Sequence, residues 1–161
     1  MTINQLVAGS PPLDTNSVYC NLLQCSHFAE TSIIAKDGAQ CLGFISGYII
    51  PSRPDTLFVW QVVVSAAARG QGLASRMLER LVERPACKGV HYIETTITPD
   101  NEASWALFRK LARQLAAPLS DSIGFDKEIH FQGAHDSEHL LRLGPFPNKK
   151  NKHSHPIGHD V

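Results

Sequence analysis

Residues 57–74 read LFVWQVVVSAAARGQGLA, an apolar run that leads through an alanine-rich spacer into a turn with two glycines. Residues 57–64 are almost all aliphatic or aromatic, which is typical of a central strand covered on both faces. After Ala74 the apolar residues recur at helical spacing, at Met77, Leu78, Leu81 and Val82. The stretch therefore predicts a buried strand, a glycine turn and the start of a helix.

A strand-to-helix turn of this composition suits a phosphate group. The first N–H groups of a helix lack partners within the helix, and the helix dipole makes that end electropositive. Gly70 and Gly72 allow a close backbone approach, and Arg69 adds a guanidinium that matches phosphate oxygens. We expect residues 69–74 to hold a pyrophosphate, with an ordinary connecting loop as the alternative.

The two glycines also form part of a dinucleotide-binding fingerprint, with Glu94 near the expected acidic position. Ser75 replaces the third glycine, however, and a four-residue spacer separates the strand from the turn. Both departures disfavour a Rossmann fold. No Gly-Lys-Ser or Gly-Lys-Thr follows, so a P-loop is excluded.

Two motifs, Arg69-x-x-Gly72-x-Ala74 and Asn101-x-x-Ser104-x-x-Leu107-Phe108, resemble those of the GNAT N-acetyltransferases. The resemblance implies acetyl-CoA as co-substrate, with its pantetheine along the strand and its pyrophosphate on the turn. Asn101 could equally serve as a helix N-cap. The implied cofactor-binding residues are Val62, Val63, Val64, Arg69, Gly70, Gln71, Gly72, Leu73, Ala74, Asn101 and Ser104.

Periodicity and turn residues divide the chain into helices and strands. The predicted helices are 2–8, 18–23, 72–83 and 102–115. The predicted strands are 31–35, 40–50, 57–64, 90–97, 123–131 and 139–143. This order suits an α+β GNAT fold, a mixed sheet flanked by helices, although the resemblance implies a further first strand that this sequence lacks.

Length and composition predict one domain and argue against a nucleic-acid or membrane partner. The 161 residues suit a GNAT domain over 1–144 and a disordered polar tail over 145–161 that buries nothing. Zero net charge argues against nucleic acid as a partner. The lack of a spanning or signal segment argues against membrane attachment and favours a cytoplasmic location. The cysteines fit no zinc site and are expected to be reduced, buried thiols: Cys20, Cys25, Cys41 and Cys87.

Four longer blocks, at 11–20, 53–62, 94–104 and 135–140, extend the resemblance to one branch of the family. Members of that branch acetylate L-2,4-diaminobutyrate on the way to the compatible solute ectoine. The resemblance implies transfer to the 4-amino group of this substrate, by a homodimer that needs no metal. The alternatives are an acetyltransferase for another small amine, such as a polyamine, and a catalytically silent CoA-binding module.

The acceptor carries two amines and a carboxylate, so acidic side chains should bind its ammonium group. Asp14 and Glu138 are the candidates for substrate binding and catalysis, with a helix cap and a solvated carboxylate as their respective alternatives. His135 is a candidate proton acceptor. The remaining predicted substrate contacts are Tyr19, Trp60 and Thr96, of which Trp60 is also counted as catalytic. Core packing is the alternative for both aromatic residues.

The catalytic groups are only partly assigned by the sequence. Phe108 stands where many GNAT enzymes have a tyrosine proposed to protonate the leaving thiolate, so the general acid is unassigned. Backbone N–H groups of residues 61–64 would bind the oxyanion if a β-bulge frees one of them. His135, Glu138 and His139 also match a zinc-peptidase pattern, which their turn-like context disfavours. Arg53 could meet the substrate carboxylate but is expected to be solvated.

Overall fold

The computed structural model describes residues 2–10 and 17–147. Within them, a mixed sheet has six strands in the order β1-β2-β3-β4-β6-β5. The strands are β1 (Ile33–Asp37), β2 (Gln40–Ile50), β3 (Arg53–Val64), β4 (Tyr92–Ile97), β5 (Leu119–Phe125) and β6 (Glu138–Leu143). The helices are α1 (Ile3–Ala8), α2 (Val18–Ser26), α3 (Leu73–Val82) and α4 (Glu102–Leu115). The predicted α+β class is confirmed. None of the helices described here is long and apolar enough to cross a bilayer.

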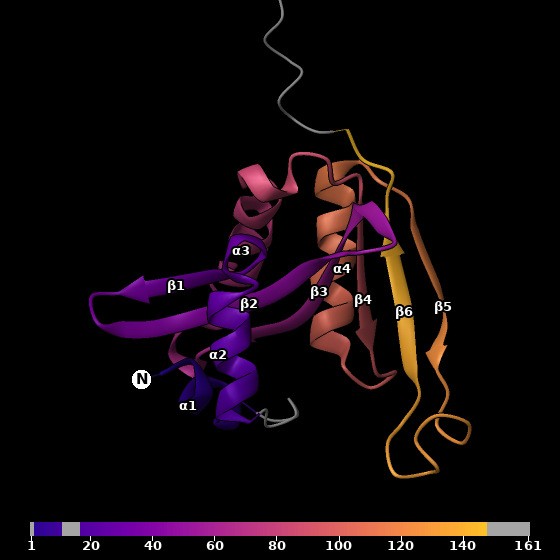
Figure 1. Ribbon diagram of the computed structural model, residues 1–161, viewed down its shortest axis with the longest axis horizontal. Helices are drawn as coiled ribbons and strands as arrows, with labels where there is room; N and C mark the ends of the chain where they lie inside the picture. The colour runs from indigo at the N-terminus through magenta and orange to yellow at the C-terminus, as the bar shows by residue number, and fades with distance from the viewer. Residues whose placement is uncertain (1, 11–16, 148–161) are drawn as a thin grey trace, which may run out of the picture.

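The two central strands separate part of the way along the sheet. Strand β3 pairs with β4 in parallel through residues 56–58 and 92–94, while the other neighbouring strands pair antiparallel. Both strands continue past that ladder, β3 to Val64 and β4 to Ile97, and they diverge (Figure 1). A single parallel pair is incompatible with the Rossmann alternative, which needs a mostly parallel sheet.

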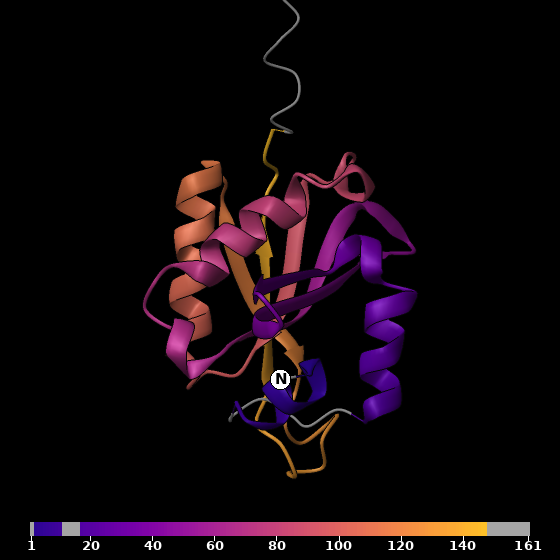
Figure 2. The ribbon, with the colours of Figure 1, turned by 90° about the vertical axis from the view of Figure 1, so that its left-hand side faces the viewer.

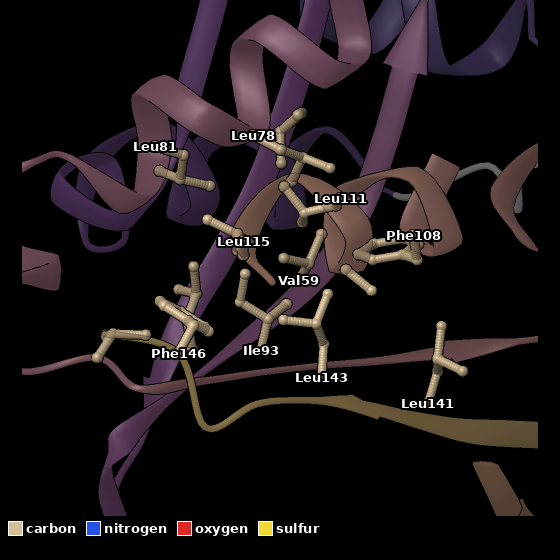
Figure 3. Close-up of a cluster of buried hydrophobic side chains, with 14 of the residues drawn as sticks. Val59, Leu78, Leu81, Ile93, Phe108, Leu111, Leu115, Leu141, Leu143 and Phe146 are labelled. Atoms are coloured by element: carbon tan, nitrogen blue, oxygen red, sulfur yellow. The ribbon is translucent and has the colours of Figure 1, made fainter. Parts of the chain in front are cut away.

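Helices cover both faces of the sheet, with α4 and α2 on opposite sides of the strands (Figure 2). The larger core lies beneath α3 and α4, where Leu78, Leu111 and Leu141 are fully buried among other apolar side chains (Figure 3). A smaller core on the other face joins Leu6 and Val7 of α1 to the sheet. The sheet is thereby fixed from both sides, and the divergence of β3 and β4 lies between the helices.

A β-bulge at Trp60 changes the direction in which the end of β3 points its side chains. Strand β2 pairs with Gln61 and then with Val59, which leaves Trp60 as an extra residue. Val59 and Val62 therefore both pack against the larger core although they are three residues apart, and Val63 packs against the smaller one. The bulge lies directly before residues 61–64, which were named for an oxyanion site.

Three predicted strand boundaries are wrong by four residues or more, and one of them is the start of β5, which lies at Leu119 rather than at residue 123. Strand β3 begins at Arg53 rather than at residue 57, because Pro54 lies in an irregular part of the β2–β3 ladder where its missing N–H costs no bond. Strand β5 ends at Phe125 rather than at residue 131. Asp126 ends it, because its Oδ1 accepts from the N–H groups of Glu128 and Ile129 at 2.8 and 2.9 Å.

The packed part of the chain continues beyond residue 144. Phe146 is only 5% exposed and inserts into the larger core near Leu115 and Ile93 (Figure 3). Its N–H donates to the carbonyl of His91 at 3.0 Å. The expectation that nothing is buried after Pro145 is therefore wrong for Phe146, while residues 148–161 of the predicted tail lie outside the described residues.

Candidate active site

A pocket of about 640 Å³ lies between the end of β3, the glycine turn and one side of α4. All but one of the predicted cofactor residues line it: Val62, Val63, Val64, Arg69, Gly70, Gly72, Leu73, Ala74, Asn101 and Ser104. The exception is Gln71, whose side-chain amide donates back to the Ala67 carbonyl at 3.1 Å. Segments far apart in the sequence thus form one cavity along the end of β3, where β3 diverges from β4.

The glycine turn has the geometry of an anion site. Gly70 and Gly72 have φ angles of 74° and 69°, in the left-handed region that favours glycine. Gly72 is the N-cap of α3, and no side chain caps this helix end, so its first N–H groups are available to a ligand in the pocket. Arg69 donates through Nε to the Val64 carbonyl at 3.1 Å, which leaves its two terminal nitrogens for an anion.

Helix α4 contributes a stripe of small and basic side chains to the same pocket. Asn101 accepts from the Ser104 N–H at 3.1 Å, so it is an N-cap, and it also lines the cavity. Ala103, Ala106 and Lys110 follow at helical spacing on the pocket side. Lys110 was missed by the sequence interpretation, although continuing the spacing from Ala103 would have found it. It supplies a second cation beside the pocket.

The predicted acceptor contacts on the strands lie across the diverging ends of β3 and β4 from the pocket. Trp60 is 45% exposed and meets Tyr48 edge-on, with ring centroids 6.5 Å apart. Thr96 lies on β4 beyond its ladder with β3 and pairs with Leu140 of β6. Glu138 is two residues from Leu140, so it shares the face of Thr96. We call this sheet face, defined by Trp60, Thr96 and Glu138, the acceptor face.

His135 and Glu138 form a pair beside the acceptor face. The His135 Nε2 atom lies 3.9 Å from Glu138 Oε1, and the imidazole packs on Phe131 with ring centroids 4.8 Å apart. His139 points to the opposite face, where its Nδ1 lies 3.4 Å from Asp121. The three residues of the zinc-peptidase pattern are thus split between the two faces, and no metal-holding cluster of three acidic, His or Cys side chains occurs among the described residues.

Two predicted substrate contacts lie on or before α2. Tyr19 is on the first turn of α2 and is 70% exposed, so the core-packing alternative is wrong for it. Asp14 lies outside the described residues. The helix is capped by Ser17, whose Oγ accepts from the Cys20 N–H at 3.1 Å, so the N-cap is Ser17 and not Asp14.

Phe108 and the cysteines contribute no reactive group to the pocket. Phe108 is 2% exposed and points into the larger core (Figure 3), so it has neither the chemistry nor the position of a general acid. Burial raises the pKa of the Cys87 thiol to about 11, which keeps it protonated at neutral pH. Cys41 is also buried, whereas Cys20 is half-buried and Cys25 is exposed, so the expectation of buried thiols is wrong for these last two.

A charged cluster joins three strands where β3 and β4 separate. Glu94 is 1% exposed, and its carboxylate accepts two bonds from Arg53, at 2.5 and 2.7 Å, and a further bond from Arg142. Burial raises the pKa of Glu94, but the hydrogen bonds from both arginines outweigh it and hold the pKa below its usual value. Arg53 is exposed, as expected, but it lies on β3 rather than in a turn and is an ion-pair partner of Glu94.

Comparisons with known proteins agree with this geometry. The acetyltransferase (GNAT) family model matches residues 6–112. The L-2,4-diaminobutyric acid acetyltransferase of Methylotuvimicrobium alcaliphilum is 55% identical over 144 residues, which cover 89% of this chain and 84% of that protein. The enzyme of the same name from Halomonas elongata is 47% identical over 145 residues, covering 89% and 75%.

Solved structures extend the comparison to bound ligands. The diaminobutyrate acetyltransferase EctA from Paenibacillus lautus, in complex with L-2,4-diaminobutyric acid and coenzyme A, matches with a TM-score of 0.86 and 40% identity, covering 91% of this chain and 89% of that one. A chain of the NatC complex bound to Gag peptide and CoA matches with a TM-score of 0.69 at 15% identity, which supports the fold alone.

Proposed function

The chain belongs to the GNAT acetyltransferases and, within them, to the L-2,4-diaminobutyric acid acetyltransferases, and from this premise we propose how it works. It transfers the acetyl group of acetyl-CoA to the 4-amino group of L-2,4-diaminobutyrate, a step of ectoine formation. The observation that carries the proposal is the pocket beside diverging strands, whose lining includes the glycine turn and the end of β3.

In this proposal the cofactor is held by parts of the chain with distinct tasks. The N–H groups at the start of α3 and the Arg69 guanidinium bind the pyrophosphate. Lys110 binds a further phosphate of CoA from α4. The pantetheine lies along Val62, Val63 and Val64, which brings the thioester to the bulge at Trp60. A backbone N–H beside the bulge then binds the oxyanion that forms during attack.

The acceptor approaches from the acceptor face. Its 4-amine must be neutral to attack, so a group at the site has to take a proton. Glu138 and His135 are close enough to act as one proton-accepting pair. Trp60, Thr96 and Tyr19 form the walls of the acceptor site, and Asp14 supplies a carboxylate for an ammonium group. Holding both reactants beside the bulge supplies much of the rate by proximity.

Two further features belong to the same proposal. We expect a homodimer, since α2 exposes Val18, Tyr19 and Leu22 together, and apolar side chains gathered on one helix often mark an interface. We also expect the enzyme in the cytoplasm, where its co-substrate acetyl-CoA is made and used. Cell fractionation followed by immunoblotting tests the location.

The regiochemistry of the product tests the proposed reaction. We would incubate the purified chain with acetyl-CoA and L-2,4-diaminobutyrate and assign the product by two-dimensional NMR. Coupling of the acetyl amide proton to the C4 methylene is expected, and coupling to C2 would contradict the assignment. Binding of CoA without any thiol release would instead favour the silent CoA-binding module.

A further inference from the structure

Arg142 lies on the acceptor face, close to Thr96, where the proposed reaction takes place. It pairs with Glu94 across β4 and β6, and the next pair on the same face of the ladder is Thr96 with Leu140, two residues on. Because side chains two residues apart share a face, Arg142 projects from the acceptor face at a distance of about 7 Å along the strands from Thr96.

The cluster around Arg142 holds two arginines and two acidic residues, because Asp55 lies near the Arg53–Glu94–Arg142 contacts. Arg53 and Arg142 both bind the one carboxylate of Glu94. Asp55 lies near Arg53 and, after the hydrogen bond to Glu94, helps to raise the pKa of Arg53, so the charge of Arg53 has a second acidic neighbour. Arg142 therefore shares the single carboxylate of Glu94 with Arg53, and its side chain keeps 30% of its surface exposed.

Arg142 is also held in one orientation. Its guanidinium carbon lies 3.9 Å from the centroid of the Tyr92 ring, a stacked contact that suits the planar guanidinium. The bond to Glu94 fixes one of its terminal nitrogens. A guanidinium fixed in this way has fewer rotamers to lose when it binds an anion, so it is preorganised for one.

The proposed acceptor has an anion at the matching distance. In L-2,4-diaminobutyrate four bonds separate the 4-nitrogen from the carboxyl carbon, which places them about 5 Å apart in an extended chain. A molecule whose 4-amine meets the thioester near Trp60 and Thr96 can therefore extend along β4 and bring its carboxylate to Arg142.

We propose that Arg142, positioned by Glu94 and Tyr92, binds the carboxylate of the acceptor and so selects amino acids over simple diamines. The inference rests on the function proposed above and adds a specificity-determining residue to it. Arg53 has a different task, which is to neutralise Glu94 so that Arg142 can be shared with the substrate.

The test compares two acceptors that differ only in the carboxylate. 1,3-Diaminopropane has the carbon chain and both amines of diaminobutyrate but no carboxylate. We would measure kcat/KM for both acceptors with the unmodified enzyme, Arg142→Gln and Arg142→Lys, and with Arg109→Gln as a control for losing an exposed arginine. Calorimetric dissociation constants for both ligands, in the presence of CoA, cover the case of slow turnover.

The proposal predicts that Arg142→Gln lowers the preference for diaminobutyrate over 1,3-diaminopropane roughly 10- to 100-fold, since a charge-assisted bond is lost. Arg142→Lys should restore part of the preference, and Arg109→Gln should not change it. An equal loss for both acceptors would show a merely structural role and overturn the inference. Failure of the unmodified enzyme to accept diaminobutyrate would overturn the proposed function instead.

Discussion

Two cations beside the pocket, Arg69 and Lys110, reach it from opposite sides of the cofactor site. Arg69 follows the strand and is tied to the Val64 carbonyl through Nε, whereas Lys110 extends from α4. We predict that Arg69→Gln and Lys110→Gln each raise the KM for acetyl-CoA about 10-fold, because each loses one charge-assisted phosphate contact. The KM for the acceptor should stay within twofold.

Steady-state kinetics with both substrates varied checks this prediction. Arg80→Gln is the control, because Arg80 is a basic residue of α3 that pairs with Glu83 at 3.3 Å and is exposed. An unchanged KM for acetyl-CoA in both variants would remove these side chains from the cofactor site.

Glu138 is the residue on which the proposed acceptor chemistry depends most. We predict that Glu138→Gln lowers kcat/KM for diaminobutyrate about 100-fold, because the amide can neither take a proton nor offset an ammonium charge. The dissociation constant of CoA, measured by calorimetry, should not change. Glu128→Gln serves as the control, since Glu128 is an exposed carboxylate in the connection between β5 and β6. Normal kinetics in Glu138→Gln would exclude Glu138 from the site.

At the scale of elements, the bulge in β3 depends on Gly47 in the facing strand. A Cβ at Gly47 would lie 2.7 Å from the Phe58 carbonyl oxygen and 3.2 Å from that of Thr31, both of which are backbone atoms. Gly47→Ala should therefore lower the free energy of unfolding by about 2–3 kcal/mol. Gly89→Ala, where the added Cβ meets nothing within 4 Å, should have little effect. Urea unfolding that gives equal losses for the two variants would refute the packing argument.

The contacts of Glu94 with Arg53 and Arg142, which connect β3, β4 and β6, should make the stability of the fold sensitive to acid. The pKa of Glu94 in the folded chain lies below the ordinary value of 4.5. The stability that it contributes is therefore present above that value and is lost as the pH falls through the folded pKa. We predict that Glu94→Gln costs about 3–5 kcal/mol at pH 7, because it leaves two arginines without their carboxylate.

Unfolding in urea at a series of pH values checks both parts of this prediction. The difference between the unmodified chain and Glu94→Gln should shrink as the pH falls below 4.5. A difference that is constant with pH would mean that the charge of Glu94 does not contribute. Glu83→Gln, which removes an exposed partner of Arg80, should change stability by less than about 1 kcal/mol.

Elements with a strong local signal were predictable from the sequence. Helix α3 falls within one residue of its predicted bounds at each end, because its apolar stripe and its glycine N-cap are both local features. The end of β5 was missed because Ile129 and Phe131 continue an apolar pattern, while Asp126 turns the chain with its own side chain. A local side-chain bond prevailed there over the strand pattern.

The site was predictable where it follows motifs and unpredictable where it depends on distant pairing. The pocket lining at residues 62–64 and 69–74 comes from contiguous motifs, and most of it was found. Arg142 and Glu94 are 48 residues apart, so no local pattern links them. The sequence interpretation considered Arg53 for the substrate carboxylate and had no means to consider Arg142, because the register of β4 against β6 appears only in the fold.

At the scale of the whole molecule, we predict a particle of two chains. Sedimentation equilibrium should give twice the chain mass of 17.7 kDa. Replacing an exposed apolar residue of α2, as in Leu22→Glu, should shift the equilibrium towards the single chain if α2 lies in the interface. A mass of one chain at micromolar concentration would contradict the homodimer.

The acceptor preference of the whole enzyme tests its proposed function most directly. We would follow thiol release from acetyl-CoA with L-2,4-diaminobutyrate, ornithine, lysine and putrescine as competing acceptors, and identify the products by mass spectrometry. The proposed function predicts the highest kcat/KM for diaminobutyrate, by about 10-fold or more. A higher value for putrescine or lysine would contradict it and assign the chain to the acetylation of another amine.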